Sequence, residues 1–286
     1  MNVSEAFDGL RNRLEITDEE QAFASRKHQE MREYLRDHFE HVEDFLTGSY
    51  ARHTKTKPLK DVDIFFVLPK GAKTGYTPAS ILGTFESVLA DEYGSDHVQT
   101  RRRSVKVEFV TDAPVTSFDV VPAFPRSGGG YEIPDTKLND WIATDPTAHD
   151  DLGTAKNKDL NDNWKPLVKM IKGANRQAGE PIKPSFLLEV MALKLVPTPG
   201  FGGFPLELQS FFHTAAEEIQ KEWPDPAGLG PPLNDEMSLT DQLRAMDFLR
   251  NAALVAEDAR RLEADGDRSG AIKKWRELFG SYMPVP

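Results

Sequence analysis

The first long segment with a regular pattern runs from Thr17 to Leu46, where apolar residues recur at steps of three and four with charged residues between them. This spacing predicts one long amphipathic helix over 17–46. Thr17 and Glu20 have the spacing of a capping box at its start. Because acids outnumber bases along the segment, we expect its polar face to be solvated rather than to bind nucleic acid.

The pattern then changes to that of strands. Asp61 to Leu68 reads DVDIFFVL and predicts a buried strand entered from its polar end. Pro78 to Tyr93 returns to a helical pattern. Ser104 to Val110 alternates apolar and polar residues, and Thr116 to Val121 follows after a turn sequence at 112–114. We predict that these last two segments are antiparallel paired strands.

Helical patterns fill nearly all of the chain beyond the Pro- and Gly-rich segment Pro122 to Pro134. The predicted helices are Asn163 to Ala174, Ser185 to Leu195, Leu206 to Glu222, Leu239 to Ala264 and Ala271 to Phe279. The fold class is therefore mixed α/β (α+β) and bilobal. We expect an amino-terminal lobe over 1–130 that holds the sheet, and a helical carboxy-terminal lobe over 131–286.

Composition excludes several classes of protein. No apolar run approaches the length of a bilayer span, and the first residues, MNVSEAFDGLRNRLEITDEE, carry charges where a signal peptide has its apolar core. We expect a cytoplasmic protein with no membrane contact. With no cysteine, disulfides and thiolate chemistry are excluded. A net charge of -11 argues against long duplex nucleic acid as a partner, but it allows a small phosphorylated substrate that brings its own cation.

Two aspartates open the DVDIFFVL strand. Asp61 and Asp63 are two residues apart, so their side chains point to the same face, about 7 Å apart. Asp119, in SFDVVPAF, lies on another predicted strand and would join the pair if the two strands are neighbours. Three ionised carboxylates repel one another unless a cation neutralises them. Oxygen ligands without His or Cys favour Mg²⁺, or Mn²⁺, over zinc.

A lone Asp-x-Asp is more often structural than functional. Here the apolar run Ile64 to Val67 follows directly, and paired acids that open so apolar a strand favour the functional interpretation.

A short polar loop precedes this strand. Gly48 and Ser49 are followed by eleven residues, 50–60, before Asp61. The glycine would allow the backbone to approach a phosphate closely, and the serine hydroxyl and nearby amides could donate to triphosphate oxygens. Tyr50, next to the serine, is a candidate for contact with the ribose or base of a bound nucleotide.

The order of these features, a helix, a Gly-Ser loop, an Asp-x-Asp strand and a third aspartate two strands later, resembles the polymerase-β-like nucleotidyltransferase superfamily. Within it, the chain is most similar to the bacterial cGAS/DncV-like nucleotidyltransferases, relatives of oligoadenylate synthetase. The resemblance covers roughly residue 47 to the carboxy terminus. It is carried further by DVVPAF, GGGYEIP, Trp141 with Thr144-Asp145-Pro146, LVKMIKGAN, KPSFLLEVM and KKWRELFG.

This resemblance implies an enzyme that uses NTPs, ATP among them, and magnesium to make a cyclic or short linear oligonucleotide second messenger. It also implies an anti-phage signalling role and a separate downstream effector that senses the product. Asp61, Asp63 and Asp119 would be the catalytic and metal-binding residues. Lys172 would contact the triphosphate and Ser185 would support it. The residues alone leave open that Lys172 is a solvated helix lysine, with Lys169 equally well placed, and that Ser185 is an N-cap.

Two alternatives remain from the residues. One is a nucleotidyltransferase that acts on RNA ends or on a small-molecule hydroxyl, for which a basic tract is expected. Arg101 to Arg103 is the one dense basic cluster; it could steer nucleotides, but such a cluster is more often a solvated strand end. The other alternative is a sensor that binds nucleotides without catalysis, which the three intact aspartates disfavour.

Overall fold

The computed structural model describes residues 1–109, 115 and 117–286, which form two compact units. The sheet unit comprises 16–150 and 226–230, and the helical unit comprises 1–15, 151–225 and 231–286. The boundary expected after residue 130 falls inside the sheet unit, and the first fifteen residues belong to the helical unit. The predicted class, a mixed α/β fold with a helical carboxy-terminal part, is confirmed.

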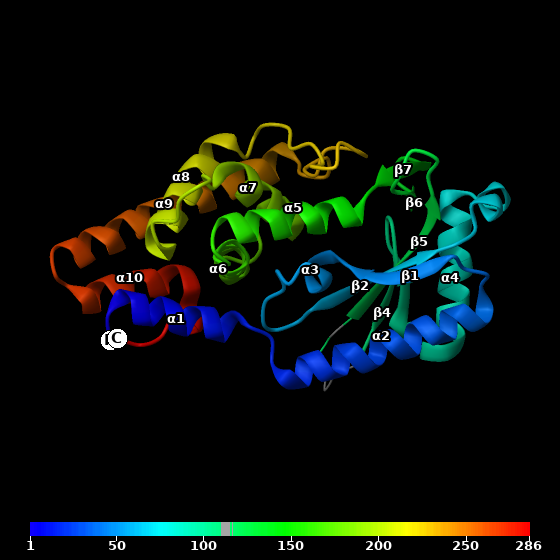
Figure 1. Ribbon diagram of the computed structural model, residues 1–286, viewed down its shortest axis with the longest axis horizontal. Helices are drawn as coiled ribbons and strands as arrows, with labels where there is room; N and C mark the ends of the chain where they lie inside the picture. The colour runs from blue at the N-terminus through cyan, green and yellow to red at the C-terminus, as the bar shows by residue number, and fades with distance from the viewer. Residues whose placement is uncertain (110–114, 116) are drawn as a thin grey trace. The chain divides into compact units, whose positions relative to one another are not determined.

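A seven-stranded mixed sheet is the framework of the sheet unit (Figure 1). Its main path runs β1 (Glu43–Thr47), β2 (Asp61–Val67), β5 (Ser117–Pro125), β4 (Val105–Glu108) and β3 (Val98–Thr100), while β6 (Tyr131–Asp135) and β7 (Asp140–Thr144) continue from β5. Within the described part of the chain, β2 and β5 pair in parallel, and the other strand pairs are antiparallel. The chain between these two strands supplies the long crossover that parallel pairing requires.

The predicted pairing of the segments at 104–110 and 116–121 is confirmed. They form β4 and the start of β5, which run antiparallel with Lys106 opposite Asp119. Residues 110–114 and 116, which include the predicted turn and one predicted end of each strand, lie outside the described residues.

Two helices cover one face of this sheet, α2 (Asp18–His38) and α4 (Pro78–Tyr93) (Figure 1). Apolar side chains that alternate along the strands, such as Ile64 and Val120, pack with residues of both helices in one buried cluster. The capping box of Thr17 and Glu20 is present at the start of α2. Because alternate residues of a strand face opposite sides, the aspartates fall on the other face.

The single helix predicted over 17–46 is wrong in its last part. The helix ends at His38, with Phe39 in an extended conformation, and residues 43–47 form β1. Phe45 there lies opposite Phe65 of β2. The apolar residues at 42, 45 and 46 fit helical spacing as well as they fit an edge strand, and pairing with β2 decides between the two.

The helical unit forms around a separate core, which contains Phe7, Trp164, Phe212 and Trp275. Its helices are α1 (Val3–Leu14), most of α5 (Pro146–Asp159), α6 (Trp164–Gln177), α7 (Ser185–Leu195), α8 (Phe204–Glu218), α9 (Leu239–Ala264) and α10 (Arg268–Phe279). All five helices predicted for this region are confirmed, with ends that differ by a few residues at most. Among the described residues, no helix is both long enough and apolar enough to span a bilayer.

Candidate active site

The parallel pairing of β2 and β5 brings the three aspartates together on one sheet. Asp63 lies directly opposite Asp119, and Asp61 lies opposite Ser117. Asp61 and Asp63 share a face because they are two residues apart, and Asp119 joins that face through its register with Asp63. The neighbouring strands that the sequence argument required are therefore present.

Gly48 lies against the carboxylate of Asp63. It begins the one-turn helix α3 (Gly48–Ala51) directly after β1, whose last residue, Thr47, is opposite Asp63. The φ of Gly48 is 67°, in the left-handed region where a Cβ is strained. An ideal Cβ on this residue would lie 1.7 Å from Oδ2 of Asp63. A glycine is thus required here by both backbone conformation and space.

The backbone after Gly48 folds into a tight turn. The carbonyl of Ser49 accepts hydrogen bonds from the amides of Thr54, at 3.0 Å, and Lys55, at 3.1 Å. Tyr50 is 6% exposed and belongs to the core of the sheet unit. Its hydroxyl accepts a hydrogen bond from Gln21 of α2, and the Lys55 ammonium lies 4.1 Å from its ring centre. The tyrosine therefore anchors the Gly-Ser loop to α2.

Asp119 is partly buried on β5, and its surroundings shift its pKa in opposite directions. Burial raises the pKa of Asp119, and the negative charge of Asp61 raises it further. A hydrogen bond of 2.7 Å from the Ser104 hydroxyl to its Oδ1, and the positive charges of Lys106 and Arg101, oppose this rise in pKa. Ser104 was not identified from the sequence, because no motif marks a serine two strands away from the first aspartates.

Hydrogen bonds fix the chain at the start of β2 and β5, the two strands that carry the aspartates. Glu20 is 4% exposed; besides capping α2, its Oε1 accepts a hydrogen bond of 2.7 Å from the amide of Leu59. The amide of Ser117 donates to the carbonyl of Lys60 at 2.9 Å. Glu20 thus holds the chain two residues before Asp61. The sequence revealed its capping role but not this second bond.

The arginine run 101–103 has a structural partner. Arg102 and Arg103 both contact the carboxylate of Asp135 on β6, with nitrogen to oxygen distances of 2.7 Å and 2.8 Å. Hydrogen bonds from both arginines outweigh the effect of burial and lower the pKa of Asp135 to about 2. Two of the three arginines therefore connect β6 to the segment that carries Ser104, whereas Arg101 is exposed.

The candidate phosphate-contacting residues Lys172 and Ser185 lie in the helical unit. Lys172 on α6 is 7% exposed, and its Nζ lies 2.6 Å from Oε1 of Glu189 on α7. It is therefore a buried, paired lysine rather than a solvated one. Lys169 is also paired, at 2.6 Å from Glu15. Ser185 is exposed and is the first residue of α7, whose N-cap is Pro184, so the serine is not an N-cap.

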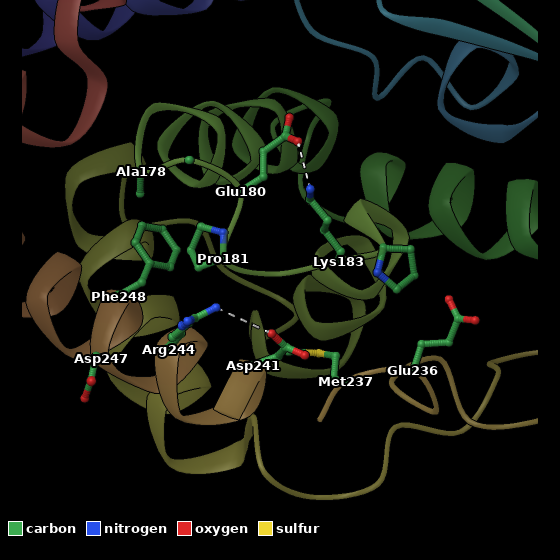
Figure 2. A pocket seen from close by; sticks show the side chains of 12 residues that line it. Ala178, Glu180, Pro181, Lys183, Glu236, Met237, Asp241, Arg244, Asp247 and Phe248 are labelled. Carbon is green, nitrogen blue, oxygen red and sulfur yellow. Dashed lines mark ion pairs between the residues drawn. The ribbon is translucent and has the colours of Figure 1, made fainter. Parts of the chain in front are cut away.

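A pocket of about 800 Å³ also lies within the helical unit (Figure 2). It is lined by the loop that follows α6 and by the first turns of α9, with Phe248, Pro181 and Met237 among its apolar lining. None of the candidate site residues lines it, although its lining residue Pro184 directly precedes Ser185. Its lining residues include two ion pairs, Glu180 with Lys183 and Asp241 with Arg244.

The donor set at the sheet suits a divalent cation by its chemistry. Its carboxylate oxygens are the ligands that Mg²⁺ and Mn²⁺ prefer. A bound cation would also offset the cost seen in the raised pKa of Asp119. Among the described residues, however, no group of three or more His, Cys, Asp or Glu side chains is arranged so that it could hold a metal ion. The three aspartates share a face of the sheet through the register of β2 and β5.

Comparison with known proteins decides the family. A family model described as "Second Messenger Oligonucleotide or Dinucleotide Synthetase domain" (SMODS) matches residues 1–157, which is more than half of the chain. The chain belongs to the SMODS family. A "Cyclic AMP-AMP-AMP synthase" from Acinetobacter sp. is 30% identical over 290 residues, covering 91% of this chain and 79% of that protein. The chain is thus a cGAS/DncV-like nucleotidyltransferase.

Solved structures share the fold of this SMODS protein. The structure of E. coli MS115-1 CdnC with ATP matches with a TM-score of 0.76 at 17% identity, over 99% of each chain. Bradyrhizobium diazoefficiens CdnG in complex with GTP matches with a TM-score of 0.77 at 16% identity, over 98% of this chain and 96% of that one. At these identities the likeness establishes the fold alone. Dependence on a divalent metal follows in general terms from membership of a nucleotidyltransferase family.

Proposed function

We propose that this SMODS protein joins NTPs, ATP among them, into a cyclic or short linear oligonucleotide second messenger for antiviral signalling. The observation that carries the proposal is the direct register of Asp63 and Asp119 across β2 and β5, with Asp61 on the same face. The relative named as a cyclic AMP-AMP-AMP synthase supports ATP as a substrate. Membership of the family favours this activity over RNA tailing and over a catalytically silent sensor.

In the proposed reaction, Asp61, Asp63 and Asp119 would hold divalent cations, Mg²⁺ or Mn²⁺, which would neutralise triphosphate charge and make an acceptor hydroxyl more acidic. That hydroxyl oxygen forms a bond to the α-phosphorus of an NTP. The bond from the α-phosphorus to the bridging oxygen of the β-phosphate breaks, and pyrophosphate leaves. The carboxylate of Asp119, which Ser104 orients through a hydrogen bond to Oδ1, accepts the hydroxyl proton.

The Gly-Ser loop binds the triphosphate in this proposal. Gly48 places its backbone next to Asp63 without a side chain in between, and Ser49 supplies a hydroxyl and a backbone amide. Tyr50 acts by holding this loop in place. We further propose that Lys172 and Ser185 support the triphosphate, that the protein works in the cytoplasm, and that a separate effector senses its product.

The direct test is to incubate the pure protein with all four labelled NTPs and Mg²⁺ or Mn²⁺, treat the mixture with phosphatase, and separate the products. Phosphatase-resistant products are expected from a cyclising enzyme, and they should vanish in the Asp61→Ala, Asp63→Ala double variant. Asp91→Asn, a change at an exposed aspartate of α4, is the matched control and should retain full activity. Products that survive the double substitution would rule out this site. Products that form only when RNA is added would instead indicate an RNA-tailing enzyme.

A further inference from the structure

A row of leucines follows the exposed side of α9. Leu239, Leu243 and Leu254 expose 67%, 41% and 62% of their surface. At about 100° per residue, the three directions lie within about 60° of one another and point away from the buried side of the helix. That buried side consists of Ala245, Leu249, Ala252, Val255, Ala256 and Ala259. The leucines thus occupy the face where an amphipathic helix normally carries polar residues.

Two opposite charges lie on the same face. Asp247 and Arg250 are both exposed, and their directions also fall within about 60° of each other by the same helical spacing. Neither takes part in an ion pair within the described part of the chain, whereas the nearby Arg244 lies 4.0 Å from Asp241. Asp247 also lines the edge of the pocket in Figure 2, where its carboxylate is drawn pointing away from the Asp241 and Arg244 pair.

The arrangement of these four residues is symmetric about one point of the helix. Leu243 and Leu254 lie equally far on either side of the midpoint between Phe248 and Leu249, and so do Asp247 and Arg250. A two-fold axis through this midpoint would place Leu243 opposite Leu254 of a second copy, and Asp247 opposite Arg250 of that copy. Each contact then occurs twice, as in any isologous interface.

We propose that α9 is the docking surface for a second copy of this chain, with the two α9 helices packed antiparallel. A surface for an unrelated partner has no reason to be complementary to itself, whereas the pair Leu243 and Leu254 and the pair Asp247 and Arg250 are related by one two-fold axis. A groove of about 370 Å³ between α8 and α9, lined by Ala216, Ala253 and Leu254 among others, would receive Leu243 of the second copy. The proposal does not depend on the catalytic assignment.

Sedimentation velocity of the full chain tests the proposal. Between about 1 µM and about 100 µM, we expect the weight-average sedimentation coefficient to rise from that of a monomer to that of a dimer. Leu243→Glu and Leu254→Glu should each raise the dissociation constant by at least about tenfold. Leu152→Glu, at a leucine of α5 that is also 41% exposed, is the matched control and should leave it unchanged. Circular dichroism confirms that each variant is folded.

A charge-swap experiment identifies the register. Asp247→Arg and Arg250→Asp should each self-associate more weakly, because like charges then face each other across the axis. An equimolar mixture of these two variants should regain association close to that of the original protein, since every charged contact in the mixed dimer then pairs an arginine of one variant with an aspartate of the other. A protein that stays monomeric throughout the range overturns the proposal. So does a dimer that the leucine variants leave intact, or a mixture of charge variants that does not associate.

Discussion

Gly48 and Asp63 are so close that a Cβ on the glycine would overlap the carboxylate, at 1.7 Å from its Oδ2. The sequence suggested that this glycine lets the backbone approach a phosphate. The structure adds a requirement that exists before any nucleotide binds, because the space a side chain would need is filled by a candidate catalytic acid. Gly48 and Asp63 therefore constrain each other.

Gly48→Ala is expected to displace Asp63 and to strain the loop. A displacement of about 1 Å at a reacting group can lower the rate about 100-fold, so we predict a loss of product formation of at least that order. Gly83→Ala is the control, because a Cβ at Gly83, within α4, meets no atom within 4 Å. Initial rates of pyrophosphate release measure both. Full activity in Gly48→Ala would show that catalysis does not require Asp63 to keep this position.

Ser104→Ala is expected to weaken catalysis without unfolding the protein. Ser104 orients Asp119 through the bond to its Oδ1, and loss of such a supporting contact typically costs about 10-fold to 100-fold in metal affinity or activity. We therefore predict a higher Mg²⁺ concentration at half-maximal rate, while Ser104→Thr, which keeps the hydroxyl, should restore most of the activity. An unchanged Mg²⁺ titration in Ser104→Ala would exclude this role.

The candidate acids could be predicted from the sequence because they rest on local pattern. The period of two places Asp61 and Asp63 on one face, and the apolar residues after them mark a buried strand. That Asp119 stands opposite Asp63 could not be predicted, since parallel pairing of β2 with β5 depends on a crossover of about fifty residues rather than on either strand's own sequence.

The sequence pattern did not predict side-chain contacts between residues that are far apart in the chain. Ser104 contacts Asp119, Arg102 contacts Asp135, and Glu189 contacts Lys172. Each of these contacts is specified by tertiary packing, and none leaves a periodic signal in the chain. The same reason explains β1, where local spacing allowed a helix and the neighbouring strand β2 overrode it.

Lys172 has a structural role that can be separated from any role in binding. Lys172→Met removes the ammonium that neutralises the buried Glu189, and breaking such a pair typically costs about 3–5 kcal/mol, so the urea midpoint should fall sharply. The Lys172→Met, Glu189→Leu double variant should recover most of that stability. If Lys172 also supports the triphosphate, the stable double variant will still show a raised KM for ATP. A KM equal to that of the original protein would assign Lys172 to the fold alone.

Protonation of Asp135 should make the free energy of unfolding depend on pH. Its pKa is lowered to about 2 by Arg102 and Arg103, so its contribution is fully present above its unfolded pKa of about 3.9 and is lost as the pH falls toward 2. We expect Asp135→Asn to be less stable by on the order of 2–3 kcal/mol at neutral pH, and this difference should shrink in acid. Urea unfolding across the acid range measures it. A difference independent of pH would contradict the assignment.

A crystal of the protein with Mn²⁺ and a non-hydrolysable ATP analogue shows whether Asp61, Asp63 and Asp119 together hold the divalent cations. Anomalous scattering at the manganese edge locates the ions without reference to any activity. We expect manganese peaks within coordination distance of all three carboxylates, with the triphosphate of the analogue against Gly48 and Ser49. Manganese peaks elsewhere, or an Asp119 carboxylate that touches none of them, would contradict this expectation.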